Sequence, residues 1–519
     1  MRYPIGIQTF EEIINGKYVY ADKTDLVYNL AQGHIFFLSR PRRFGKSLLI
    51  STLEAYFTGK KELFRGLKME ELEKEWTEYP VLRIDFAAGN FNKQETLEDI
   101  LDNTLSKWEK KYNIVNERKT PEVRFSNILE AAEEQTGHKA VVLVDEYDKP
   151  MLDVLGTEQE QKNRETLKGF YSTFKEADAH LRFVFLTGVT KFSQVSVFSG
   201  LNNLKDISMD SRYDAICGIT EEELYSYFHE SIHNLAEKKK CSADEMKKKL
   251  KKQYDGYHFS ENTDVDIYNP YSLINAFDSM KTEDYWYESG TPTYLVKLLG
   301  GHNVNMQKLI SQPYERKYFI DYRADSEDPL AMLYQSGYLT IKGYDEEYNE
   351  YLLDFPNDEV RKGFVTLIAN DYFKNPEDRP DSWIKNLDRM LKRCDLDGVH
   401  TAFKSFLSSI PYEANKDERA KDFETHFSYT FYIIIRLLSC YTVLIEKQNS
   451  KGRADIIIET VNDVFIFEFK LDGSVEEALK QIDEKQYAVP YLSDKRKVHK
   501  IGVNISSETR TVDGWLVVD

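Results

Sequence analysis

The chain has 519 residues, a formal net charge of −18 and 30% charged side chains. At roughly 150 residues per domain this length predicts about three domains, and a composition of 41% hydrophobic and 13% aromatic residues excludes a largely disordered chain. The acidic balance disfavours a general nucleic-acid-binding surface, so a role on nucleic acid requires local basic surface or divalent metal.

Cysteines and apolar segments limit the cellular setting. The four cysteines, Cys217, Cys241, Cys394 and Cys440, lie far apart and form no C-x-x-C pair, which predicts neither a zinc site nor a disulfide framework. No stretch reaches the roughly 18 apolar residues of a membrane span, and the first residues lack the apolar core of a signal peptide. We therefore expect a cytoplasmic protein without a membrane partner.

The first chemical motif lies in residues 35–51. After a short strand and turn (18–24) and a helix (25–31), the apolar run IFFL leads into SRPRRFGKS (39–47) and then LLI, which predicts a strand, a phosphate loop and a helix. Helix-start N–H groups at Gly45, the Lys46 ammonium and the Ser47 hydroxyl suit the phosphates and Mg²⁺ of ATP, with Arg42 or Arg43 assisting. Arg40 occupies the first glycine position of the usual G-x-x-x-x-G-K-[ST] pattern, so the match is partial, and a basic surface turn is the alternative.

The second motif is AVVLVDE at residues 140–146. Its β-branched run predicts a central parallel strand, which places Asp145 at the ligand-binding end of the sheet to hold Mg²⁺ together with Ser47. Glu146 could then polarise the attacking water, whereas the plainer interpretation is a buried strand entering an acidic turn. Residues 81–86 predict another strand between the loop and the Asp145 strand, an arrangement typical of P-loop ATPases with a catalytic glutamate.

Further along the chain, residues 92–135 predict helices and LRFVFLTGVTK (181–191) predicts another buried strand. Thr187, Thr190 or Lys191 could sense the γ-phosphate, with strand-end capping as the alternative. A capping box at residues 220–223 starts a helical, aromatic-rich region whose aromatic residues favour core packing over base stacking. A turn or linker follows at 376–380, and helices are expected from there to about residue 440.

The second chemical constellation is a predicted β-hairpin, GRADIIIE (452–459) followed by VFIFEFK (464–470). A turn centred between residues 461 and 462 pairs Asp455 with Glu468, and alternation puts Lys470 on the same face. Two carboxylates beside a lysine suit Mg²⁺ or Mn²⁺ and phosphodiester hydrolysis, while a structural salt bridge is the alternative. Glu424 on a preceding helix is a possible third carboxylate, and Gln481 on a following helix could contact metal-bound water or phosphate.

Both constellations resemble known families. Residues 1–215 resemble the bacterial AAA-ATPase-like family through RPRRFGKS (40–47), VDEYDKP (144–150) and TGVTK (187–191), which makes Arg40 a family trait. About 110 C-terminal residues resemble the PD-(D/E)XK nuclease superfamily, in the branch that accompanies this ATPase. This resemblance implies metal ligands at Asp455 and Glu468, a catalytic Lys470, a supporting acid at Glu424 and an assisting Gln481; Ala454 replaces the usual proline.

The predicted fold is α/β: a P-loop parallel sheet flanked by helices (1–215), a helix-rich middle region acting as a lid, winged helix or linker (216–378), and a PD-(D/E)XK nuclease-like α/β domain (379–519). We expect an ATP-binding or ATP-hydrolysing protein that regulates or powers a nuclease acting on nucleic acid, with DNA favoured over RNA. One alternative is a nucleotide-gated switch or scaffold whose nuclease fold only binds a partner. Another is an ATPase machine whose hairpin acids are structural. Self-association is left open.

Overall fold

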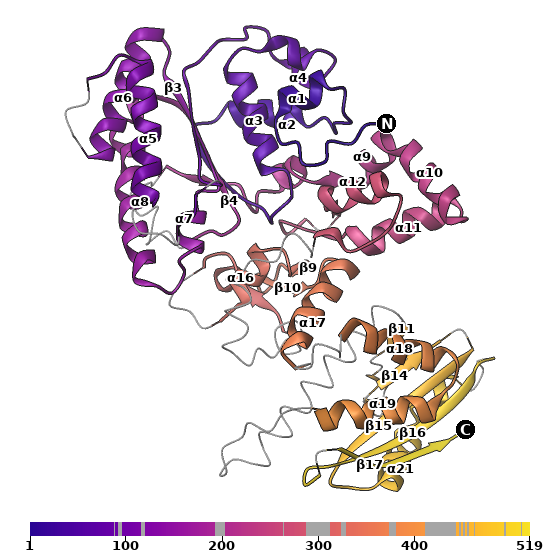
Figure 1. Ribbon diagram of the computed structural model, residues 1–519. Helices are drawn as coiled ribbons and strands as arrows, with labels where there is room; N and C mark the ends of the chain where they lie inside the picture. The colour runs from indigo at the N-terminus through magenta and orange to yellow at the C-terminus, as the bar shows by residue number, and fades with distance from the viewer. Residues whose placement is uncertain are drawn as a thin grey trace. The chain divides into compact units, whose positions relative to one another are not determined.

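The architecture is described from a computed structural model, which divides the chain into two compact units, residues 1–360 and 361–519 (Figure 1). The described residues are 1–87, 89–91, 96–115, 120–192, 203–262, 264–286, 312–322, 328–372, 380–409, 443–445, 448–449, 452–453, 456–460, 462–491, 495–509 and 511–519. Among them, no helix has the length and apolarity needed to cross a bilayer.

The first unit is built on a five-stranded parallel sheet with the order β2-β3-β4-β1-β5. All six residues of β3 are buried, as predicted for a central strand. Figure 1 shows α5, α6 and α8 on one side of these strands and α1 to α4 on the other. The strands are β1 (Ile35–Ser39), β2 (Val81–Asp85), β3 (Ala140–Asp145), β4 (Leu181–Gly188) and β5 (Lys205–Asp206).

The helices around this sheet mostly follow the sequence prediction. The polar stretch 92–135 contains two helices, α5 and α6, and the residues before the phosphate loop form α2. The expected strand at 18–24 is wrong, because residues 18–23 have no regular secondary structure. The helices are α1 (Phe10–Asn15), α2 (Thr24–Ala31), α3 (Lys46–Phe57), α4 (Lys68–Leu72), α5 (Thr96–Lys111), α6 (Pro121–Thr136), α7 (Lys149–Leu152) and α8 (Glu158–Glu176).

The strand order corrects one further expectation. The strand at 81–85, β2, does not lie between the loop strand and the Asp145 strand in space; it lies at the edge of the sheet, beyond β3. The strand inserted between β1 and β3 is β4, with Phe37 paired to Leu186 and Leu143 paired to Phe185. Sequence proximity could not reveal this order, since parallel strands connected by helices need not be neighbours.

The rest of the first unit combines helices with a small antiparallel sheet. The capping box predicted at Thr220 is present at the start of α9, with both reciprocal hydrogen bonds to Glu223. Tyr254, Tyr257 and Tyr268 are 0–1% exposed, which supports core packing for these aromatic residues. The elements are α9 (Glu221–Tyr227), α10 (His229–Lys239), α11 (Ala243–Tyr254), α12 (Pro270–Ser279), α16 (Leu330–Gln335), a β6 (Ile219–Thr220) and β7 (Ile267–Tyr268) pair, and the sheet of β8 (Tyr314–Glu315), β10 (Glu350–Asp354) and β9 (Thr340–Asp345).

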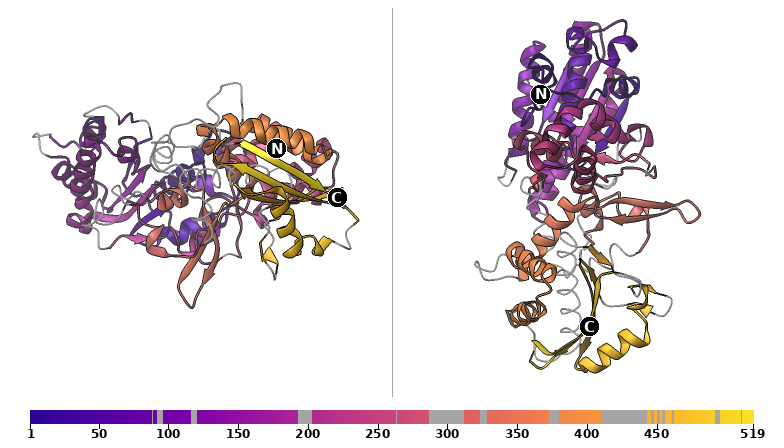
Figure 2. Two further views of the ribbon diagram at one scale, coloured as in Figure 1. Left: turned by 90° about the horizontal axis from the view of Figure 1, so that it is seen from below. Right: turned by 90° about the vertical axis from the view of Figure 1, so that its right-hand side faces the viewer.

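The second unit contains a mixed five-stranded sheet, β11-β14-β15-β16-β17. Both views in Figure 2 show α18 and α19 on one face of the sheet and α21 on the other. The helix α21 connects the parallel strands β15 and β16. The elements are α18 (Pro380–Lys392), α19 (Leu396–Ser409), β11 (Val443–Ile445), β14 (Ile456–Glu459), β15 (Asp463–Leu471), α21 (Val475–Glu484), β16 (Lys497–Ser506) and β17 (Thr511–Val518), while α17 (Asp358–Tyr372) spans the boundary between the units and β12 (Gln448–Asn449) pairs with β13 (Gly452–Arg453).

Candidate functional site

The predicted phosphate loop connects β1 to α3. Gly45 has φ of 94° immediately before the first residue of α3, and a Cβ there would meet nothing within 4 Å. Arg43 also has a positive φ, 68°, which is uncommon for a residue with a side chain. This backbone presents the unpaired N–H groups at the start of a twelve-residue helix to one side of the loop.

Four predicted residues converge beside this loop. Lys46 Nζ donates to the backbone carbonyls of Arg40 and Pro41 at 2.9 Å each. The Ser47 side chain hydrogen-bonds Asp145, which ends β3 and is 1% exposed. The next residue, Glu146, has φ of 51° and donates its backbone N–H to Asp145 Oδ1 at 3.1 Å.

Burial and charge shift the ionisation of this cluster. Burial raises the pKa of the Asp145 carboxyl above its ordinary value, and the Ser47 hydrogen bond and the Lys46 charge oppose this effect. Burial also raises the pKa of Glu146, again opposed by Lys46. Lys46 has its pKa lowered by burial, against the attraction of Glu146 and Asp145. The cluster therefore pairs a buried ammonium with two carboxyl groups of increased basicity.

Arg40, at the first glycine position, makes contacts away from these four side chains. It is 1% exposed and donates to the carbonyl oxygens of Ser39, Ser208 and Tyr213 at 2.9, 2.8 and 3.1 Å. Its guanidinium carbon lies 4.0 Å from the ring centroid of Phe259. The arginine thus joins the loop to the segment after β5 and to the aromatic core.

The three predicted sensor residues have protein partners in this structure. Thr187 Oγ1 donates to the carbonyl of Leu38 across the sheet at 3.0 Å, and the fully buried Thr190 contacts the sulfur of Met332 at 3.8 Å. Lys191 Nζ lies 2.9 Å from carboxylate oxygens of both Asp206 and Asp321. These contacts fix the end of β4 and connect it to other segments of the chain. A role in sensing the γ-phosphate stays a prediction.

Asp148, which we did not single out from the sequence, holds the end of β4 in place. Its Oδ2 accepts the backbone N–H groups of Val189 and Thr190 at 3.0 and 2.6 Å. Burial raises its pKa to about 6. A Cβ at Gly188 would lie 2.4 Å from Asp148 Oδ1, so glycine is required where this carboxyl passes β4.

Residues beyond 215 also hold the phosphate loop. The Trp286 indole N–H donates to the Arg42 carbonyl at 3.0 Å, and the Trp286 backbone N–H donates to the buried Glu359 carboxyl at 2.7 Å. Phe44 packs edge-on against Tyr257 with ring centroids 4.8 Å apart. The loop conformation therefore depends on segments up to about 300 residues away in the sequence.

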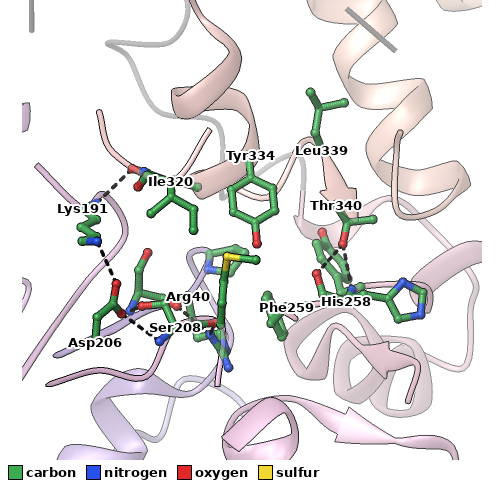
Figure 3. A pocket seen from close by; sticks show the side chains of 15 residues that line it. Arg40, Lys191, Asp206, Ser208, His258, Phe259, Ile320, Tyr334, Leu339 and Thr340 are labelled. Carbon is green, nitrogen blue, oxygen red and sulfur yellow. Dashed lines mark hydrogen bonds and ion pairs between the residues drawn. The ribbon is translucent and has the colours of Figure 1, made fainter. Parts of the chain in front are cut away.

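A pocket lies on the Arg40 side of the loop (Figure 3). Figure 3 shows Tyr334 and Ile320 above Arg40, with Phe259 and His258 opposite the pair of Lys191 and Asp206. Thr340 Oγ1 accepts the backbone N–H of His258 at 2.8 Å. The residues lining the pocket are Ser39, Arg40, Pro41, Lys191, Asp206, Ser208, Met209, Tyr257, His258, Phe259, Ile320, Tyr334, Gln335, Leu339 and Thr340.

In the second unit, three of the predicted nuclease residues meet on the face of the sheet that α21 covers. Glu468 is 1% exposed, and Lys470 Nζ lies 3.5 Å from its Oε1. Gln481 on α21 accepts from Lys470 Nζ at 2.6 Å and donates through Nε2 to Glu468 Oε1. The arrangement is a buried carboxylate, an ammonium and an amide in mutual contact.

The register of the predicted hairpin is confirmed where it is described. Ile456 pairs with Phe467, Ile457 with Ile466, Ile458 with Phe465 and Glu459 with Val464, as expected for a turn centred between residues 461 and 462. Val464 and Ile466 pack with α21, whereas Phe465 and Phe467 contact His499 and Trp515 on the opposite face, so the predicted alternation also holds. Asp455 and Glu424 lie outside the described residues.

Comparison with known proteins agrees with this architecture. Residues 4–198 match the family described as predicted AAA-ATPase, and residues 422–515 match the PD-(D/E)XK nuclease superfamily. The chain is 35% identical over 524 residues to an "uncharacterized protein in vnfD 5′region" of Azotobacter chroococcum mcd 1, covering 99% of this chain and 98% of that protein. It belongs to the AAA-ATPase-like family that carries a PD-(D/E)XK nuclease domain.

The family assignment accounts for both constellations. An AAA-ATPase-like domain and a PD-(D/E)XK domain are present, and the relative across the full chain is bacterial. A solved structure of the Aeropyrum pernix ORC2 protein (ADPNP-ADP complexes) matches with 13% identity and a TM-score of 0.24, covering 69% of this chain and 90% of that one. At that TM-score the likeness carries no argument.

Sequence reasoning missed the residues that act across long separations. In the sequence, Arg40 is a departure from the motif and a trait of the resembling family, and nothing local to Trp286 or Glu359 indicates contact with the loop or its neighbours. A buried acid in the first turn of a helix, such as Glu359, usually resembles a solvated helix-start carboxylate in sequence. Only the folded contacts distinguish the two.

Proposed function

We propose that the protein binds and hydrolyses ATP with Mg²⁺ in its first unit, and that this regulates or powers a divalent-metal-dependent nuclease in its second unit. The observation that carries the proposal is the convergence of Lys46, Ser47, Asp145 and Glu146 at the carboxyl ends of parallel strands, beside the start of α3.

Each of these groups suits one part of phosphoryl transfer. Lys46 and the N–H groups from Gly45 onward would hold the phosphates, with exposed Arg43, now 4.9 Å over the Tyr271 ring, as an additional cation. The Ser47 hydroxyl and the Asp145 carboxylate are adjacent oxygen donors, which fit Mg²⁺. Mg²⁺ bound there would neutralise charge on the phosphates.

Glu146 is the residue proposed to orient and deprotonate the attacking water. Its raised pKa makes it a better proton acceptor than an exposed glutamate. Thr187, Thr190 and Lys191 would have to exchange their protein partners for phosphate before any of them could sense the nucleotide.

In the second unit, Glu468 is proposed as a ligand of Mg²⁺ or Mn²⁺, with Asp455 as the other, as the sequence pattern predicts. Lys470 would orient the attacking water, and Gln481, which contacts both Glu468 and Lys470, would fix their side chains. Glu424 is proposed as a supporting acid. Metal at this site would activate water and stabilise charge on the scissile phosphate. The substrate is nucleic acid, with DNA favoured over RNA.

The test is cleavage of single- and double-stranded DNA and RNA by the full chain, with Mg²⁺ or Mn²⁺, in the presence and absence of ATP. Glu468→Ala and Lys470→Ala should abolish cleavage, whereas Lys480→Ala, which changes a 73%-exposed lysine on α21, should not. Lys46→Ala should lose ATP binding, and Glu146→Gln should keep binding but lose turnover. Unchanged ATP affinity in Lys46→Ala would contradict the assignment of this loop as the ATP site.

The net charge of −18 favours a second candidate, a nucleotide-gated switch or scaffold whose second unit binds a partner. The same assay decides between the two. Absence of cleavage under every condition, with ATP still bound, selects the switch. Cleavage lost in Glu468→Ala, and altered by ATP only when Lys46 is present, selects the ATP-controlled nuclease.

A further inference from the structure

A second group of metal-ligating side chains lies in the second unit, outside the proposed nuclease site. Cys394, Asp463 and His499 each offer one ligand atom, and these atoms all lie within 4.8 Å of one another. His499 Nε2 is 3.4 Å from Cys394 Sγ and 3.0 Å from Asp463 Oδ1. The three residues come from the turn between α18 and α19, the start of β15, and β16.

The spacing is close to that of donors around a tetrahedral ion. With Zn–S of about 2.3 Å and Zn–N or Zn–O of about 2.0–2.2 Å, neighbouring donors lie about 3.3–3.6 Å apart. The two measured separations, 3.4 and 3.0 Å, differ from this by a few tenths of an ångström. The third separation, between the ligand atoms of Cys394 and Asp463, is at most 4.8 Å, so binding of one ion by all three groups brings these two side chains closer by up to about 1.5 Å.

Contacts on the far side of the His499 ring hold its Nε2 toward Cys394 and Asp463. Its Nδ1 lies 2.6 Å from Asp519 Oδ1, and its ring stacks on Phe465 with centroids 5.0 Å apart and planes 15° apart. A carboxylate at one imidazole nitrogen is the usual arrangement behind a metal-bound histidine, because it fixes the tautomer that leaves the other nitrogen lone pair for the metal. His499 is 2% exposed, so this orientation is held by packing.

The backbone after α18 places the Cys394 side chain in the cluster. Its φ is 56°, in the left-handed region, at the position after helix α18 where glycine or asparagine is usual. The same left-handed conformation occurs at other helix ends of this chain, such as Lys240 and Met280, so it positions the Cys394 side chain without marking a site. Here the side chain that results is a thiol 3.4 Å from His499.

We propose that Cys394, Asp463 and His499 bind a divalent transition metal of the zinc class, with Asp519 as a positioning residue. Thiolate and imidazole ligands select such ions over Mg²⁺. Asp463 and Glu468 are five positions apart on β15, about 17 Å along an extended strand, so this site is separate from the nuclease metal. The ion would link the α18–α19 turn to the sheet and to the residue after β17, which makes it structural.

The experiment is Co²⁺ and Zn²⁺ titration of the full chain after chelation, in wild type, Cys394→Ser, Asp519→Asn and Cys241→Ser. We expect one Co²⁺ with a thiolate charge-transfer band and the visible spectrum of tetrahedral cobalt, displaced by Zn²⁺. Cys394→Ser should lose the band and at least tenfold in affinity, and Asp519→Asn should lose about tenfold. Cys241→Ser alters a thiol of the first unit with similar partial exposure and should behave as wild type.

A second measurement uses the wild type alone, so its result does not depend on whether the variants fold. Zn²⁺, but not Mg²⁺, should slow alkylation of Cys394, followed by mass spectrometry of its own peptide, and should leave Cys241 unchanged. Absence of protection, or a cobalt spectrum without a thiolate band, would overturn the proposal and leave the cluster as an imidazole held between two carboxylates. A band that survives Cys394→Ser would place the metal on another thiol and would equally overturn it.

Discussion

Arg40 tests whether a departure from the phosphate-loop pattern serves nucleotide binding or stability. Arg40→Ala removes a buried guanidinium that donates to three backbone carbonyls at 2.8–3.1 Å and lies 4.0 Å over Phe259. Hydrogen bonds from a charged donor contribute about 1.5–3 kcal/mol each, but alanine also removes the cost of burying the charge. We therefore expect a loss of about 3–5 kcal/mol, typical of breaking a buried charged contact.

The assay is urea unfolding of the full chain, with the transition of the first unit fitted by itself. Arg65→Ala, at an exposed arginine of the same unit, is the matched control and should change the unfolding free energy by no more than about 0.5 kcal/mol. Arg40→Lys keeps the charge without the planar fork and should fall between the two. A loss below about 1 kcal/mol in Arg40→Ala would refute the reasoning. If ATP affinity fell instead, the guanidinium would contact phosphate.

Three further changes test other contacts. Trp286→Phe removes the indole hydrogen bond to the Arg42 carbonyl and should weaken ATP binding by about 2–10-fold, the equivalent of 0.5–1.5 kcal/mol, in equilibrium titration. Burial raises the pKa of Glu359 to about 8, so this carboxyl stays protonated in the folded protein up to about that pH but ionises above about pH 4.5 in the unfolded chain. The free energy of unfolding should therefore fall by up to about 1.4 kcal/mol per pH unit between these two values. Glu359→Gln should remove this contribution from urea unfolding curves measured at pH 5 to 8. Gln481→Ala should slow metal-dependent cleavage tenfold or more, since the amide contacts both Glu468 and Lys470, while leaving ATP turnover unchanged.

Local patterns predicted the two constellations because their chemistry is local in sequence. The phosphate loop lies within nine residues, and Asp145 and Glu146 end a strand whose burial is readable from its β-branched run. The hairpin register followed from a four-residue connection, 460–463, and the period of two along each strand. In both cases the pattern within one short segment fixes which of its own side chains share a face or a strand end.

Contacts between distant segments were not predictable in the same way. Arg40 contacts Ser208 and Tyr213, which lie 168 and 173 residues later, and Cys394 contacts His499 across 105 residues. The lack of a C-x-x-C pair predicts no zinc site, but that pattern detects only ligands from one short segment, whereas the proposed site takes its ligands from three. The predicted strand order was wrong for the same reason, since β4 lies in the sheet between β3 and β1, which both precede it in the chain.

The conformation of the phosphate loop depends on contacts with residues far beyond residue 215. Trp286 holds the Arg42 carbonyl, Glu359 holds the Trp286 backbone, and a Cβ at Gly337 would lie 2.6 Å from the Pro41 side chain. Residues 40–46 therefore owe their conformation to residues up to 359, and a fragment ending near 215 lacks these supports. Because a ligand that binds only the folded loop stabilises everything the loop requires, ATP at 100 times its Kd should add about 2.7 kcal/mol to unfolding of the whole 1–360 unit. Under the proposed function, nucleotide binding is therefore thermodynamically coupled to folding of the middle segment.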